Sequence, residues 1–101
     1  MAGDRDPKDF LSELRWLANG VAVEKEWRSS DIAAGEFYCA IFDDYLIEDA
    51  SKIYALNTRE VCYVENIAHF LQLASPGSNL DVQAVLDDPN FRIAQKIAEL
   101  L

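Results

Sequence analysis

Apolar side chains recur at helical spacing near the start of the chain. At about 100° per residue, one face of a helix over residues 7–19 collects the large apolar side chains, which are Phe10, Leu11, Leu14, Leu17 and Ala18. Asp6 is a good N-cap, Pro7 suits the first helical position and Gly20 is a typical C-terminal stop. We therefore predict a helix over 7–19. Trp16 stands out, because it falls on the polar side of this helix.

The segment from 31 to 56 predicts a long helix, about 40 Å in length at 1.5 Å per residue. The apolar stripe that would face a partner helix consists of Cys39, Phe42, Leu46, Ile53 and Leu56. A buried strand at 36–42 is the alternative, because periodicity alone does not separate a helix from a strand in a short apolar run. The preceding segment, 21–28, is compatible with a helix, a strand or a loop.

Two helices are predicted next. Asn57 and Glu60 have the spacing of a capping box at the start of a helix over 58–74. Half of that helix is apolar, through Val61, Tyr63, Val64, Ile67, Ala68, Phe70, Leu71 and Ala74. Ser78 then introduces a short helix near 79–87.

A last helix begins where Asp88 serves as N-cap and Pro89 takes the first position. We expect Phe91, Ala94, Ile97, Ala98 and Leu101 to face inward, and Arg92, Gln95, Lys96 and Glu99 to face water. Together these patterns predict an all-α fold, a compact bundle of four to five amphipathic helices in one domain over 1–101. An α+β fold with a short strand or hairpin around 36–47 is the alternative.

Charge narrows the classes of partner. The 18 acidic side chains outnumber the nine basic ones, which gives a formal net charge of −9 at pH 7. A chain this acidic is repelled by nucleic acids and anionic membranes, so a protein with a basic surface is the expected partner. The acidity is concentrated in the middle of the chain, since residues 29–75 hold eight of the acidic side chains and two of the basic ones.

The location expected for the chain is cytoplasmic. The N-terminus lacks the apolar core of a secretory signal, and the longest apolar run, six residues, is far below the ~20 needed to cross a bilayer. The two cysteines, Cys39 and Cys62, are too few for a disulfide framework and form no CxxC pair.

No pattern in the sequence is typical of catalysis. Cys62 and His69 share a polar helical face, but seven residues separate them by about 10 Å along the axis, which is beyond hydrogen-bond reach. The acidic run at 43–49 lacks the glycine and the alternating oxygen ligands of a calcium-binding loop. We therefore expect no enzymatic activity, no metal and no cofactor.

The remaining candidates point to protein binding. Trp16 has the large, rigid side chain that is typical of binding hot spots. An acidic cluster would attract a basic partner over a distance, and its members are Asp43, Asp44, Glu48 and Asp49. The leading hypothesis is a non-enzymatic interaction module such as an inhibitor, an immunity-type protein, an adaptor or an assembly factor. The alternatives are a structural homo-oligomer, with a homodimer as its simplest form, and a nucleic-acid mimic that inhibits a DNA- or RNA-binding protein.

Overall fold

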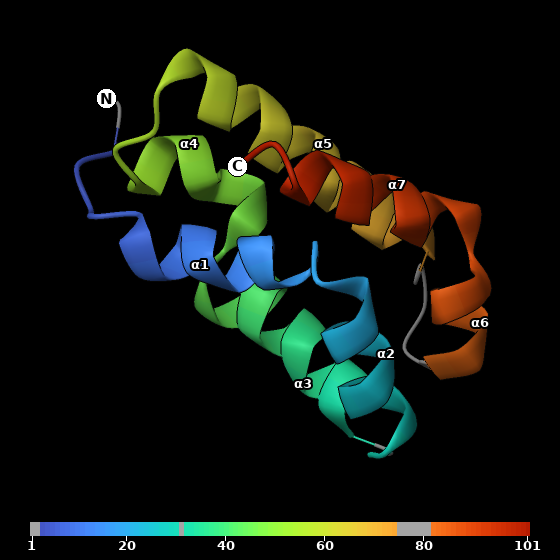
Figure 1. Ribbon diagram of the computed structural model, residues 1–101. Helices are drawn as coiled ribbons and strands as arrows, with labels where there is room; N and C mark the ends of the chain where they lie inside the picture. Colours follow the sequence, from blue (N-terminus) through green and yellow to red (C-terminus); the bar gives the residue numbers. More distant parts are fainter. Residues whose placement is uncertain (1–2, 31, 75–81) are drawn as a thin grey trace.

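A short link joins the first two helices, and it lies at a different position from the one predicted. A computed structural model describes residues 3–30, 32–74 and 82–101 (Figure 1). Helix α1 (Lys8–Trp16) buries Phe10, Leu11 and Leu14 as predicted. The predicted stop at Gly20 is wrong, because Gly20 begins α2 (Gly20–Arg28). The side chain of Asn19 accepts a hydrogen bond from the Ala22 N–H at 3.2 Å and so caps α2. The segment 21–28 is thus helical.

The single long helix predicted over 31–56 is interrupted in the structure. Helix α3 (Ala33–Cys39) continues into a π-helical turn, η1 (Ala40–Asp44), and a 3₁₀ turn, η2 (Ile47–Asp49), leads into α4 (Ala50–Ile53). Between the two turns Leu46 has φ 57° and ψ 54°, a left-handed conformation that ends any right-handed helix. The strand predicted as the alternative for 36–42 is wrong, since those residues are helical.

These interruptions explain why the predicted apolar stripe is not the buried one. In the π turn the Tyr45 N–H donates to the carbonyl oxygen of Ala40, five residues back, at 2.8 Å. The extra residue in the turn and the reversal at Leu46 rotate every later side chain about the helix axis. Leu46 is therefore exposed, Cys39 before the π turn is exposed as well, and Phe42, Ile53 and Leu56 are only partly buried. The buried set in this segment is instead Ala34, Phe37, Ile41, Ile47, Ala50 and Tyr54.

The C-terminal helices follow their capping signals. Helix α5 (Thr58–Ala74) begins with a reciprocal capping box, in which Asn57 and Glu60 each accept a hydrogen bond from the other's backbone N–H, at 2.8 and 2.9 Å. Helix α6 (Val82–Asp87) lies within the predicted short helix, while Ser78 and residues 79–81 are outside the described residues.

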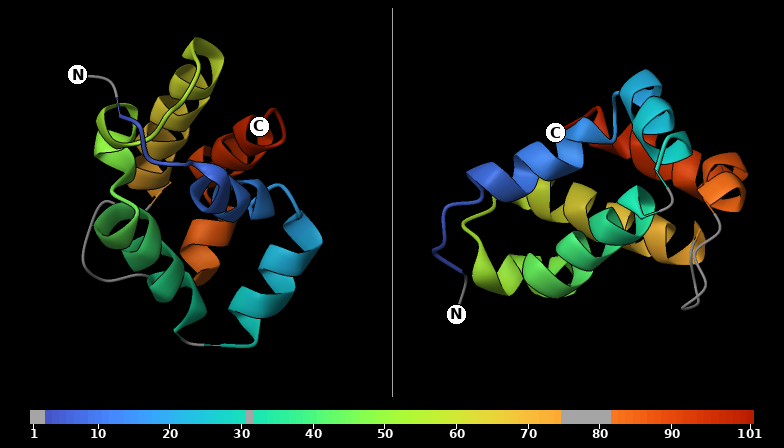
Figure 2. Two further views of the ribbon diagram at one scale, coloured as in Figure 1. Left: turned by 90° about the vertical axis from the view of Figure 1, so that its left-hand side faces the viewer. Right: turned by 90° about the horizontal axis from the view of Figure 1, so that it is seen from below.

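Helix α7 (Pro89–Ala98) is capped by Asp88, whose side chain accepts from the Asn90 N–H at 2.8 Å. It lies along α5 in both views (Figure 2). Helix α7 also contacts α1 and α6, and α2 packs on α3 and α6. The all-α class is confirmed, since the described residues form helices and no strand beyond one isolated bridge. The molecule measures 39 × 24 × 21 Å.

One polar residue of α7 does not face water as predicted. Gln95 is 8% exposed, and its Nε2 atom donates to the carbonyl oxygen of Leu17 at 3.1 Å. Its Oε1 atom accepts from Arg92, which also forms an ion pair with Glu24 of α2 at 2.7 Å. Gln95 is buried because the link between α1 and α2 crosses α7 there and leaves the Leu17 carbonyl without a helical partner.

An extended N-terminal segment packs against the end of α4. The Arg5 N–H donates to the Ile53 carbonyl at 3.1 Å, and the Ala55 N–H donates to the Arg5 carbonyl at 2.9 Å. Gly3 lies so close to the Ile53 backbone that a Cβ atom there would clash with it. Among the described helices, none is both long and apolar enough to span a membrane.

Candidate functional site

The indole of Trp16 packs on core aromatic rings on one side and is exposed to solvent on the other. Its ring centroid lies 6.4 Å from that of Trp27 and 6.0 Å from that of Phe37. Trp27 is 1% exposed and packs on Phe91 as well, so it belongs to the core. Trp16 is only half-buried, and its indole N–H forms no hydrogen bond within the described part of the chain. These contacts fix the orientation of the indole while leaving one side of it accessible.

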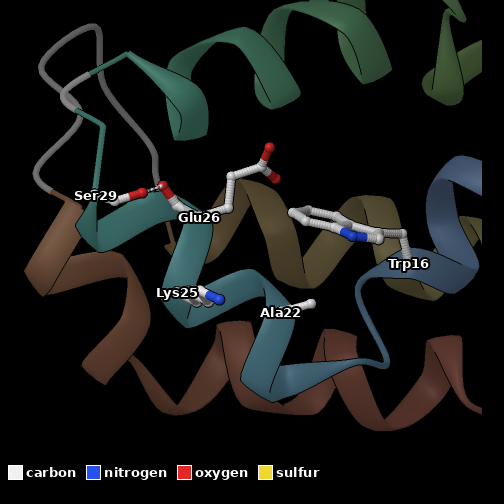
Figure 3. Close-up of a pocket in the computed structure, with 5 residues that line it drawn as sticks. All are labelled: Trp16, Ala22, Lys25, Glu26 and Ser29. Atoms are coloured by element: carbon white, nitrogen blue, oxygen red, sulfur yellow. Dashed lines mark hydrogen bonds between the residues drawn. The ribbon is translucent and has the colours of Figure 1, made fainter.

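Two adjoining hollows lie on the open side of this indole. One, of about 390 Å³, is lined by Ser12, Glu13, Trp16 and Glu26. The other, of about 340 Å³, is lined by Trp16, Ala22, Lys25, Glu26 and Ser29 (Figure 3). Trp16 and Glu26 belong to both hollows, and Figure 3 shows the Glu26 side chain extending from α2 on the side where the indole lies.

Carboxylates of α1 and of the turn η1 meet around Tyr45. Burial raises the pKa of the Tyr45 phenol above its ordinary value. Three carboxylates raise that pKa further, because nearby negative charge disfavours the phenolate, and they are those of Glu13, Asp9 and Asp44. The Phe10 ring, 5.7 Å from the Tyr45 ring, packs this turn against α1. Asp44, the residue before Tyr45, is exposed at the end of this turn.

We call this combined surface the α1 face, and define it by Asp9, Glu13, Trp16, Glu26, Asp44 and Tyr45. Asp9, Glu13 and Trp16 follow one another at i, i+4 and i+7 along α1, so they form one stripe. Glu26 lines the hollow beside Glu13 and Trp16, and Asp44 acts together with Asp9 and Glu13 on the Tyr45 phenol. Four carboxylates and two aromatic rings therefore gather on one surface.

The structure divides the predicted acidic cluster. All four of its members are exposed, and of the four only Asp44 acts on the Tyr45 phenol together with Asp9 and Glu13 of α1. Glu48 instead lines a separate hollow of about 220 Å³ against α5, together with Ile47, Glu65, Ala68, His69 and Gln72. Asp43 and Asp49 line neither the hollows beside Trp16 nor the one against α5.

Two residues of the α1 face escaped the sequence reasoning. Glu13 precedes Trp16 by three residues on the same helix, so the i, i+3 spacing could have identified it. Glu26 comes close to Trp16 only because of the turn that the chain makes at Asn19. No sequence signal specifies that angle, and helical periodicity does not connect side chains on two different helices.

The chemistry available at the α1 face is recognition of a cation. Within the part of the chain that the structure describes, no ion pair involves Glu13 or Glu26, and the one ion pair present joins Arg92 to Glu24. Over the same residues no group of His, Cys, Asp or Glu is arranged to hold a metal ion. Cys62 and His69 are both exposed on α5, and the Asn66 side chain lies against Cys62, donating to its carbonyl oxygen at 2.8 Å.

Comparison with known proteins yields no relative for this arrangement. No protein-family model matches the chain, and neither the curated proteins nor the solved structures include a significant match.

Proposed function

We propose that this chain is a non-enzymatic protein-interaction module whose α1 face docks a basic surface of a partner protein. The observation that supports this most is the half-buried indole of Trp16 between two carboxylates that have no ion-pair partner among the described residues. An orientated aromatic side chain next to unpaired charge is typical of interface anchors.

The proposed mechanism has two parts. The carboxylates of the α1 face are part of the net charge of −9, and they raise the association rate of a basic partner. Trp16 then supplies a contact that slows dissociation, because it is already held by Trp27 and Phe37 and loses little conformational freedom on binding.

The test begins with affinity capture from the source cell's lysate at low and at high salt, followed by association kinetics with the purified partner. Two charge-matched triple variants are compared. One removes three charges of the α1 face (Asp9→Asn, Glu13→Gln, Asp44→Asn), and the other removes three predicted acids outside it (Asp43→Asn, Glu48→Gln, Asp49→Asn).

We expect the first triple variant to lower the association rate constant about tenfold at low salt, and the second to lower it much less. Equal effects of the two variants would assign the steering to net charge and reject the α1 face as the docking site. Light scattering tests the homo-oligomer alternative. A dimeric mass that becomes 11.4 kDa in a Glu13→Gln/Glu26→Gln variant would assign the face to self-association.

A further inference from the structure

The hollow between Glu13, Trp16 and Glu26 has a composition that selects one kind of side chain. Its lining consists of an indole, two carboxylates and the small hydroxyl side chain of Ser12. An apolar occupant would desolvate two charges without replacing their hydrogen bonds, which is unfavourable. An anionic occupant would be repelled. A cationic side chain fits both features, since it pairs with the carboxylates and is attracted to the face of the ring.

The charges that would receive this cation are unpaired within the described residues. Lys25 lines the adjoining hollow with Ala22 and Ser29, but it does not line the hollow that contains Glu13. Arg15, the basic neighbour of Trp16 on α1, is directed elsewhere, because its Nε atom donates to the Leu101 carbonyl at 3.0 Å. No cation of the described chain therefore occupies the space between Glu13 and Glu26.

Trp16 adds a hydrogen-bond donor without an acceptor to the hollow. Its indole N–H has no hydrogen-bond acceptor among the described residues, and its position is fixed by Trp27 and Phe37. An indole N–H at an interface usually finds an acceptor when a partner covers it. A backbone carbonyl next to the partner's cationic residue would supply one. A peptide segment thus satisfies the site more completely than a free cation does.

From these features we propose that the hollow receives an arginine side chain of the partner, a refinement that rests on the proposed function. The guanidinium group is planar, so it can stack on the indole while its N–H groups at opposite edges donate to Glu13 and Glu26. A lysine ammonium is compact and more strongly hydrated, and it cannot stack and bridge two carboxylates at the same time.

The experiment uses two synthetic nine-residue peptides of glycine and serine with four cationic positions, arginine in one and lysine in its twin. Binding to the ¹⁵N-labelled chain is followed at low salt by NMR, through the indole N–H resonance of Trp16. Trp16→Phe assigns that resonance by its disappearance. We expect the arginine peptide to shift the resonance and to bind about threefold to tenfold more tightly than its lysine twin, the size of one cation–π contact.

Two double variants with the same change in charge locate the preference. Glu13→Gln/Glu26→Gln should abolish it, and Asp43→Asn/Asp49→Asn should leave it intact. Both pairs are exposed side chains, so neither variant disturbs the core. Twin peptides that bind equally and salt-sensitively would overturn the arginine site while leaving the proposed function standing. If neither peptide binds at low salt, both proposals fail.

Discussion

Gln95→Leu tests whether a single buried hydrogen bond fixes the position of α1 against α7. The Nε2 atom of Gln95 is the only donor that the described residues offer to the Leu17 carbonyl. Leu17 is 0% exposed, so water cannot replace that donor. An unsatisfied buried polar group costs about 1–3 kcal/mol. Leucine keeps most of the side-chain volume, so a cavity contributes little to the loss.

A second, smaller loss comes from Arg92. Arg92 donates a hydrogen bond to Gln95 and forms an ion pair with Glu24. The side chains of Arg92 and Glu24 are both about 40% exposed. An exposed pair contributes only about 0.2–1 kcal/mol. The Leu17 carbonyl therefore dominates, and we expect Gln95→Leu to lower the free energy of unfolding by about 2 kcal/mol in total.

Urea denaturation followed by circular dichroism measures this loss. Gln72→Leu is the matched control, because Gln72 is an exposed glutamine of α5 and should change stability by no more than about 0.5 kcal/mol. If Gln95→Leu unfolded at the same urea concentration as the wild type, or at a higher one, the assigned role of the Leu17–Gln95 hydrogen bond would be refuted.

Three further substitutions, two of them with a matched control, test the backbone at Gly3 and Leu46 and the phenol of Tyr38. Gly3→Ala forces a Cβ atom into the Ile53 backbone, so the two backbone hydrogen bonds of Arg5 are lost and the free energy of unfolding should fall by about 1–3 kcal/mol. Gly20→Ala is the control: a Cβ atom there meets no atom nearer than 4.0 Å, so the melting temperature should stay equal or rise. Leu46→Gly relieves the backbone strain of a left-handed residue that is 41% exposed, so it should leave the stability unchanged or raise it. Leu73→Gly, on a helix and 46% exposed, is the control and should lower the free energy of unfolding by about 1 kcal/mol. Equal losses in the two variants would reject strain at Leu46. Burial, and then the charge of Asp88, raise the pKa of the Tyr38 phenol above its ordinary value. The unfolded chain therefore loses that proton first as pH rises past about 10, and stability falls by up to ~1.4 kcal/mol per pH unit. Tyr38→Phe should show a shallower loss between pH 10 and 11 in urea titrations, and parallel curves would contradict this.

The parts of the fold that the sequence predicts well are those where side chains themselves satisfy the helix ends. Asn57 with Glu60 and Asp88 with Pro89 each specify a first turn locally, and both helices begin where predicted. The break at Leu46 carries no such signal. Neither glycine, proline nor asparagine stands at this position, and the left-handed conformation is imposed by the packing of Ile41 and Ile47 on either side of it.

The candidate site follows the same division. The unusual position of Trp16 on the polar side of its helix is a property of one helix, so the sequence displays it. The grouping of Asp43, Asp44, Glu48 and Asp49 assumed a continuous helix, but the helix is interrupted at Leu46 and Glu48 lies against α5. Side chains that come together through the crossing of two helices, as Glu26 and Trp16 do, need the three-dimensional structure.

The polar contacts between the first and the last helices have a consequence for how the protein is made. Arg15 and Leu101 are 86 positions apart in the chain, and Leu17 and Gln95 are 78 positions apart. At a translation rate of ~5–20 residues per second, Gln95 is synthesised roughly 4–16 s after its partner. For that interval a nascent chain carries α1 without the contacts that α7 supplies and with the Leu17 carbonyl unpaired. The bundle therefore closes only once α7 has left the ribosome, and chaperones have several seconds in which to bind the unfinished chain.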